Sequence, residues 1–161
     1  MLDAVERAAA GGLFAGREVL VQSGHNPDFH PLHCILEPFL RMEAFEEEIR
    51  AADLVVCHGG AGTLLTVLGA GRVPIVMPRR RCHAEIVDDH QTDLVRALAE
   101  EDRVVPAFEA GDLPGAVRKA LQAGLSRSGP PRVPPLIALV SDAIDDLLLK
   151  KKPDVKAGAR P

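Results

Sequence analysis

The feature that most constrains the fold is an apolar run that passes directly into a glycine-rich turn. Residues 53–57 (DLVVC) are apolar after the first aspartate, which is typical of a strand buried on both faces of a sheet. Residues 58–63 (HGGAGT) follow at once, and residues 63–70 have the apolar pattern of a short helix closed by Gly71. A strand, a tight glycine turn at residues 59–62 and a helix in immediate succession predict one unit of a parallel sheet with helical connections.

The same alternation of strands and helices runs along most of the chain. Helices are expected where apolar residues recur at intervals of three or four, and strands where short apolar runs are bounded by turn residues. The pattern predicts an α/β fold, a Rossmann-like parallel sheet with helices on both faces. The other expected strands are residues 18–23, 74–77 and 104–108, and the other expected helices are residues 2–10, 41–52, 84–100 and 113–122.

Four segments divide the chain. Residues 1–123 hold the alternating pattern and are expected to form one domain. Residues 124–135 contain four prolines and are expected to form a linker. Residues 136–152 carry an apolar stripe at helical spacing, which either packs on the domain of the same chain or docks on a partner. Residues 153–161 are expected to be a disordered tail.

Charge and composition exclude several classes of function. The 161 residues have a formal net charge of −4 and 3% aromatic residues without Trp or Tyr, which argues against a nucleic-acid-binding protein. Residues 54–71 carry no formal charge, but five glycines, a histidine and two threonines divide them, so no transmembrane segment is expected. The three cysteines form no CxxC pair and are odd in number, which favours a reducing cytoplasm over a disulfide scaffold.

Two polar segments are expected to meet at one edge of the sheet, because each follows the carboxyl end of a strand. The first is the glycine turn, which comprises His58, Gly59, Gly60, Ala61, Gly62 and Thr63. The unpaired N–H groups of a helix N-terminus favour a diphosphate, and glycines let the backbone approach the anion closely. The second segment comprises Arg79 in a basic loop and the downstream residues Asp89, His90 and Gln91, which suit sugar hydroxyls. The alternative interpretations are a plain turn and a solvated helix face.

Familiar cofactor and catalytic motifs are missing from the sequence. The turn lacks the third glycine of GxGxxG, so a nicotinamide or flavin site is weakly supported. There is no GxxxxGK[ST] motif of a P-loop and no GxSxG elbow of a serine hydrolase. Each cysteine adjoins a histidine, as His33-Cys34, Cys57-His58 and Cys82-His83, but these spacings match no common zinc module. No metal site is therefore expected.

Taken together, these segments resemble the C-terminal donor domain of family 28 glycosyltransferases. The resemblance rests on residues 51–63 (AADLVVCHGGAGT), 71–79 (GRVPIVMPR) and 89–91 (DHQ), and it spans roughly residues 19–123. Each piece is weak alone, whereas their order in combination is specific. The chain is similar to small catalytic subunits of two-subunit UDP-sugar transferases, of the dolichol-linked N-acetylglucosaminyltransferase and bacterial exopolysaccharide types.

The resemblance implies one half of a GT-B fold that binds a UDP-sugar and transfers the sugar with inversion, without a metal or other cofactor. Residues 59–63 would hold the diphosphate with His58 beside them, Gln91 and His90 would contact sugar hydroxyls, and Arg79 would line the uracil or diphosphate side. A membrane-anchored partner subunit would contribute the acceptor site and the general base, so no catalytic residue is assigned in this chain. The chain would act in the cytoplasm or peripherally at the inner membrane, on a lipid-linked or polysaccharide acceptor.

Two departures from the family pattern bear on activity. Relatives carry a glutamate that binds the ribose hydroxyls three residues after the threonine of the turn, and here that position is Thr66. Relatives also begin with a strand before the first helix, so the sheet of this chain is expected to lack a strand and to leave an edge uncovered. The alternative function is a non-catalytic, degenerate scaffold or regulator. A dinucleotide-dependent oxidoreductase is a third and weaker interpretation.

Overall fold

A computed structural model describes residues 1–14, 16–79 and 90–122 of the chain. The described residues belong to one compact unit. The linker expected at residues 124–135, the amphipathic helix expected at 136–152, the tail at 153–161 and the beginning of the helix expected at 84–100 lie outside the described residues.

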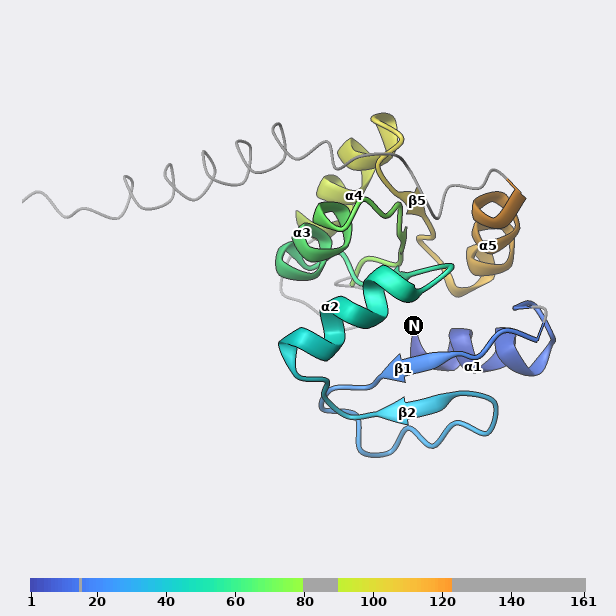
Figure 1. The fold of residues 1–161 in the computed structure, drawn as a ribbon. Helices are drawn as coiled ribbons and strands as arrows, with labels where there is room; N and C mark the ends of the chain where they lie inside the picture. Colours follow the sequence, from blue (N-terminus) through green and yellow to red (C-terminus); the bar gives the residue numbers. More distant parts are fainter. Residues whose placement is uncertain (15, 80–89, 123–161) are drawn as a thin grey trace, which may run out of the picture. The chain divides into compact units, whose positions relative to one another are not determined.

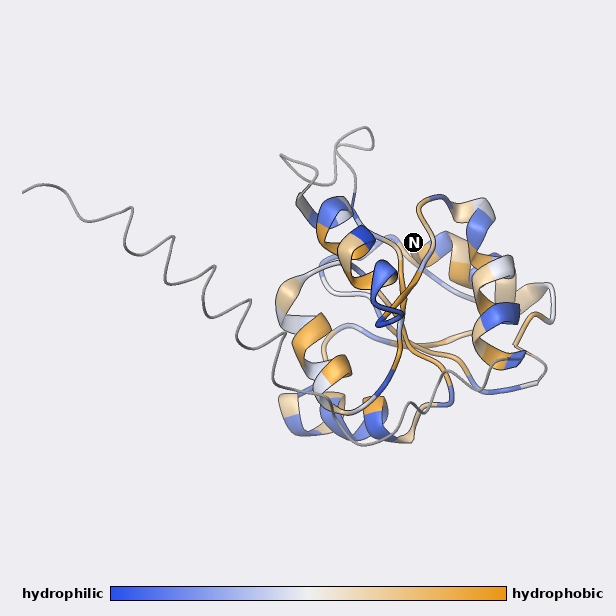
Figure 2. Cartoon of the chain, turned by 90° about the horizontal axis from the view of Figure 1, so that it is seen from above, coloured by the Kyte–Doolittle hydropathy of each residue, from blue (hydrophilic) through white to orange (hydrophobic). Residues whose placement is uncertain are grey.

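Apart from β1 and β2, which follow one another without a helix between them, strands and helices alternate along the described chain, as the sequence pattern predicts. The strands form the middle layer, with α1 and α5 on one side and α2, α3 and α4 on the other (Figures 1 and 2). The fold is therefore a Rossmann-like α/β domain, one half of a GT-B fold. The elements are α1 (Leu2–Ala10), β1 (Leu20–Gln22), β2 (Ile35–Glu37), α2 (Met42–Ala51), β3 (Val56–Cys57), α3 (Ala61–Gly69), β4 (Ile75–Val76), α4 (His90–Glu100), β5 (Val105–Pro106), the 3-10 helix η2 (Ala110–Asp112) and α5 (Leu113–Gln122).

All the described strand pairs are parallel. β1 pairs with β2, with Val21 opposite Leu36. β4 pairs with β3 on one side and β5 on the other, so that the second sheet has the order β3-β4-β5. Because parallel strands run the same way through a sheet, the loops that follow β3 and β4 leave it at the same carboxyl edge.

The main hydrophobic core lies where α1 and α5 pack on the strands. Figure 2 shows the hydrophobic colour concentrated on the strands and on the helix faces that turn toward them. On α5 the buried positions recur at intervals of three and four, which gives the helix one apolar face. These positions are Leu113, Ala116, Val117 and Ala120, and they share one buried cluster with Ile75 of β4.

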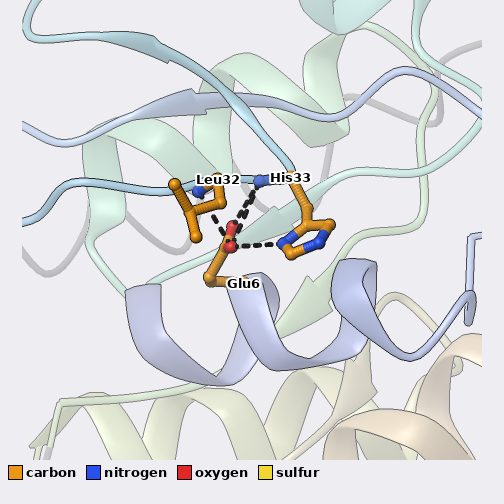
Figure 3. Close-up of polar contacts among 3 residues, drawn as sticks. All are labelled: Glu6, Leu32 and His33. Atoms are coloured by element: carbon orange, nitrogen blue, oxygen red, sulfur yellow. Dashed lines mark hydrogen bonds and ion pairs between the residues drawn. The ribbon is translucent and has the colours of Figure 1, made fainter.

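Hydrogen bonds of the Glu6 side chain join α1 to the loop that precedes β2 (Figure 3). Its carboxylate accepts hydrogen bonds from the backbone N–H of Leu32 at 2.9 Å and of His33 at 3.1 Å, and it contacts Nδ1 of His33 at 2.7 Å. The hydrogen bond with the His33 side chain is the largest influence that lowers the pKa of Glu6 to about 2. At neutral pH the carboxylate is therefore ionised and holds this loop against α1.

Several element boundaries differ from those expected from the sequence. β2 was not expected, because it has three residues, of which Ile35 and Glu37 are exposed, and shows no clear apolar alternation. α3 begins at Ala61 rather than at Thr63, because Ala61 and Gly62 already have helical backbone after the extended residue Gly60. The glycine turn expected at residues 59–62 is therefore shorter than the sequence indicated.

The described strands form two separate sheets rather than one continuous sheet, and the break lies between β1 and β3. The side chains of Arg17 and Asp53, which precede β1 and β3 respectively, form an ion pair of 3.3 Å across this break. β2 lies on the opposite side of β1 (Figure 1).

Candidate functional site

The amino end of α3 is the centre of the candidate site. Gly60 is the N-cap residue and has no side chain to accept a hydrogen bond, while its carbonyl accepts from the N–H of Leu64 at 3.0 Å. No acidic residue lies in the first turn of α3. The first N–H groups of a helix have no acceptor within the helix, and they carry a partial positive charge. The amino end of α3 can therefore receive an anion.

The three glycines of the turn have different structural roles. A Cβ at Gly59 would lie 3.2 Å from Cβ of Gln91 and 3.2 Å from Cγ2 of Val95, so close packing against α4 explains this glycine. A Cβ at Gly60 or Gly62 would meet nothing within 4 Å, and neither residue has a positive φ. A glycine inside a helix, as Gly62 is in α3, costs about 0.5–1 kcal/mol relative to alanine. Since packing and conformation do not require Gly60 and Gly62, access of a ligand to the backbone is a physical reason for them.

The second predicted segment meets the glycine turn through Gln91. The backbone N–H of Arg79 donates to Oε1 of Gln91 at 3.0 Å, and the same side chain lies against Gly59. The structure thus brings Gly59, Arg79 and Gln91 together at the carboxyl edge of β3 and β4. Because Oε1 of Gln91 accepts from Arg79, its amide NH₂ is the part of the side chain suited to donate to a ligand.

Two further predicted residues lie at or just before the amino end of α3. Thr63 lies in the first turn of α3 and is half-buried, as is His58, which comes just before the glycines. The side chain of Arg79 is exposed. His90 is the first residue of α4, and Asp89 lies outside the described residues.

Thr66 lies on the part of α3 that faces α2. Its hydroxyl donates to the carbonyl of Gly62 at 3.1 Å, within α3. Thr66 lines a hollow between α3 and α2, together with Glu46, Arg50, Leu65, Gly69 and Ala70. Among the described residues, the hydrogen bond of the Thr66 side chain stays within α3, whereas Gly59 and Arg79 both contact Gln91.

Two functional details were not found from the sequence. Val95, one helical turn beyond Gln91, packs against Gly59. The side-chain carbonyl of Gln91 accepts a hydrogen bond from the backbone N–H of Arg79 and so holds this backbone in place. The apolar spacing of α4 indicated that Val95 is buried, but no sequence signal indicated which glycine it would meet. Likewise, Glu46 and Arg50 of α2 were not expected beside Thr66, because their proximity depends on how α2 packs on α3.

The cysteines of the described chain are poorly suited to react. Burial raises the pKa of the Cys57 thiol to about 12. Burial and, to a smaller extent, the carboxylate of Glu6 raise the pKa of the Cys34 thiol to about 11. Both cysteines are free, and no group of three metal-ligating side chains occurs among residues 1–14, 16–79 and 90–122. Cys82 lies outside these residues.

Within the described part of the chain, no helix is both long and apolar enough to span a membrane.

Comparisons with known proteins agree with the resemblance seen in the sequence. The model of the glycosyltransferase family 28 C-terminal domain matches residues 5–129. A UDP-N-acetylglucosamine–N-acetylmuramyl-(pentapeptide) pyrophosphoryl-undecaprenol N-acetylglucosamine transferase of Xanthomonas campestris pv. campestris is 38% identical over 71 residues, 44% of this chain and 16% of the relative. The UDP-N-acetylglucosamine transferase subunit ALG13 of Cryptococcus neoformans var. neoformans serotype D is 38% identical over 65 residues, 39% of this chain and 30% of the relative.

These matches thus cover less than a third of the length of either relative. No solved structure matches the chain significantly.

Proposed function

Because the chain belongs to the glycosyltransferase family 28 C-terminal domain family, we propose that it is the donor-binding part of an inverting UDP-sugar hexosyltransferase. The observation that carries the proposal is the amino end of α3. There the helix N-terminus has no side-chain cap, Gly60 and Gly62 leave its backbone open, and Gln91 and Arg79 lie at the same edge. An anion flanked by a sugar fits this arrangement.

In the proposed complex the diphosphate of the donor lies against the first N–H groups of α3. These groups and the positive end of the helix stabilise the negative charge that develops on the leaving UDP as the bond to the sugar breaks. Gln91 donates from its amide to a sugar hydroxyl, with His90 and Asp89 beside it in the sequence. Arg79 lines the uracil or diphosphate side. The donor needs no other cofactor in this proposal.

The acceptor and its activating base belong, in this proposal, to a membrane-anchored partner subunit. The name of the Cryptococcus relative describes a transferase subunit, which supports a partner subunit here. The name of the Xanthomonas relative describes a pyrophosphoryl-undecaprenol acceptor, which supports a lipid-linked acceptor, with a polysaccharide as the alternative. The chain would then work in the cytoplasm, held at the inner membrane by its partner.

Calorimetry with UDP, UDP-N-acetylglucosamine, UDP-glucose and UDP-glucuronate tests the proposal. We expect the unmodified chain to bind at least one of them, and Gly60→Val to lose that binding by at least tenfold, because a branched side chain covers the backbone that the diphosphate approaches. The matched control is Gly115→Val on α5, where a Cβ also meets nothing within 4 Å. Equal binding by Gly60→Val and the unmodified chain would place the donor elsewhere.

A second candidate function is a non-catalytic scaffold or regulator that keeps the fold. The observation in its favour is Thr66, which stands where relatives carry the ribose-binding glutamate. Its hydroxyl already donates to Gly62. The same calorimetry separates the two candidates, because a scaffold of this kind binds none of the four UDP compounds.

A further inference from the structure

The buried face of α4 carries a polar side chain next to apolar ones. Thr92, Val95 and Leu98 follow one another at intervals of three residues and are 8%, 0% and 5% exposed. This spacing places them on one face of the helix. Because Val95 packs against Gly59, this face is turned toward the glycine turn. Thr92 therefore lies on the inner face of α4, one residue beyond Gln91.

The hydroxyl of Thr92 is buried without a hydrogen-bond partner among the residues that the structure describes. Burying a hydroxyl that makes no hydrogen bond is unfavourable, because the group loses its bonds to water and gains nothing in exchange. A valine has nearly the same shape and would fill the same space without this cost. Packing and folding therefore give no reason for a hydroxyl at this position, and a ligand is a physical reason for it.

The place of Thr92 in α4 connects its hydroxyl with the candidate site. Thr92 lies in the first turn of the helix, and the Cα–Cβ bonds of a helix tilt toward its amino end. That end of α4 lies where the Gln91 side chain accepts from the backbone N–H of Arg79 and packs on Gly59. The Thr92 side chain is thus directed to the end of α4 that contacts the glycine turn.

The chemistry of a hydroxyl indicates which part of a UDP-sugar it suits. The Thr92 hydroxyl can donate one hydrogen bond and also accept, and a sugar hydroxyl can do the same, so the two can pair in either sense. A diphosphate oxygen only accepts, and the first N–H groups of α3 already offer it donors. Since Gln91 is proposed to contact the transferred sugar, the adjacent hydroxyl of Thr92 suits a hydroxyl of the same sugar.

We propose that Thr92 is a specificity-determining residue of the donor site, whose hydroxyl bonds to one hydroxyl of the transferred sugar. This inference rests on the proposed function and adds to it a residue that distinguishes between sugars. Because Oγ1 of Thr92 is buried, the amino end of α4 has to move slightly for the sugar to reach it. A sugar that lacks the matching hydroxyl, or carries it in the epimeric orientation, leaves Thr92 unpaired and binds more weakly.

Calorimetry on the full chain with UDP, UDP-glucose, UDP-galactose and UDP-N-acetylglucosamine tests this role. We expect Thr92→Val to weaken binding of the preferred UDP-sugar by about tenfold, the effect of losing one hydrogen bond, and that of the other sugars less. Binding of UDP should stay unchanged, because UDP carries no transferred sugar. Thr92→Ser is the matched control, since it keeps the hydroxyl and should keep the preference among the sugars.

Urea unfolding of the same variants separates a ligand-binding hydroxyl from a structural one. We expect Thr92→Val to raise the urea midpoint, because it removes a buried hydroxyl that has no partner. A lower midpoint for Thr92→Val, with Thr92→Ser unchanged, would show that the hydroxyl is bonded within the fold and would overturn the proposal.

The binding data can also overturn it in two ways. Equal loss of UDP and UDP-sugar binding in Thr92→Val would show that the hydroxyl does not act on the sugar. An unchanged preference among the sugars in Thr92→Val would show that Thr92 does not determine specificity. Failure of the unmodified chain to bind any of the four compounds would instead contradict the proposed function, and this inference with it.

Discussion

At the scale of single residues, the glycines between β3 and α3 have two different roles. Gly59 allows close packing against α4, whereas Gly60 and Gly62 leave the backbone open to a ligand. We expect Gly59→Ala to destabilise the fold by about 1–3 kcal/mol, the usual cost of overpacking, because its Cβ would lie 3.2 Å from side-chain atoms of Gln91 and Val95. Gly62→Ala should instead stabilise the fold by about 0.5–1 kcal/mol, because it removes a helical glycine and meets no neighbour. Urea unfolding measures both. Equal destabilisation by the two variants would contradict this assignment.

Thr66 allows a residue-scale test of the ribose site. Its hydroxyl donates to Gly62, so it can offer a ligand only a neutral acceptor. A carboxylate accepts from two vicinal hydroxyls, so Thr66→Glu should tighten UDP binding by roughly tenfold, about 1.4 kcal/mol, while the affinity for 2′,3′-dideoxy-UDP stays nearly unchanged. Thr66→Val is the control, which keeps the shape and removes the hydroxyl. If both nucleotides respond alike to Thr66→Glu, the ribose does not lie at this position.

At the scale of elements, the attachment of α1 to the loop before β2 should depend on pH. The pKa of Glu6 is about 2 in the folded chain against an ordinary value of 4.5. A lowered pKa stabilises the fold above the ordinary value, and this contribution is lost as the pH falls from about 5 toward 2. Glu6→Gln should therefore lower the urea midpoint at pH 7 and have little effect near pH 2. The exposed Glu47→Gln on α2 is the control. A midpoint difference that stays constant over this range would contradict the assignment.

The elements also show which parts of the fold can be predicted from sequence patterns. The long helices α2 and α5 were predicted almost to the residue, because their apolar positions have a clear helical period. β2 was not predicted because its short apolar part is followed at once by Glu37 and Pro38. The beginning of α3 was misplaced because glycines carry no helical signal. Pairing of Gln91 with the glycine turn could be predicted in outline from the parallel topology, whereas the fine contacts with Arg79 and Val95 depend on how α4 packs.

At the scale of the whole molecule, we expect the isolated chain to bind donor without transferring sugar. One half of a GT-B fold supplies the donor surface, and the acceptor and its base are proposed to come from the partner. Transfer of radiolabelled sugar from UDP-sugar to a lipid-linked acceptor should be at background for the purified chain and should appear when the partner is added. Robust transfer by the purified chain alone would contradict the proposal that the partner supplies the acceptor and its base.

The central claim is that a UDP-sugar binds at the edge formed by the glycine turn, Arg79 and Gln91. Titration of the isotopically labelled chain with UDP, followed by amide chemical shifts, tests it most directly. We expect the largest changes in chemical shift at the backbone amides of residues 60–63, with further changes at Arg79 and at the side-chain amide of Gln91, while the amide shifts of α5 stay unchanged. Saturating changes confined to α1 and α5, or no changes at millimolar UDP, would contradict it.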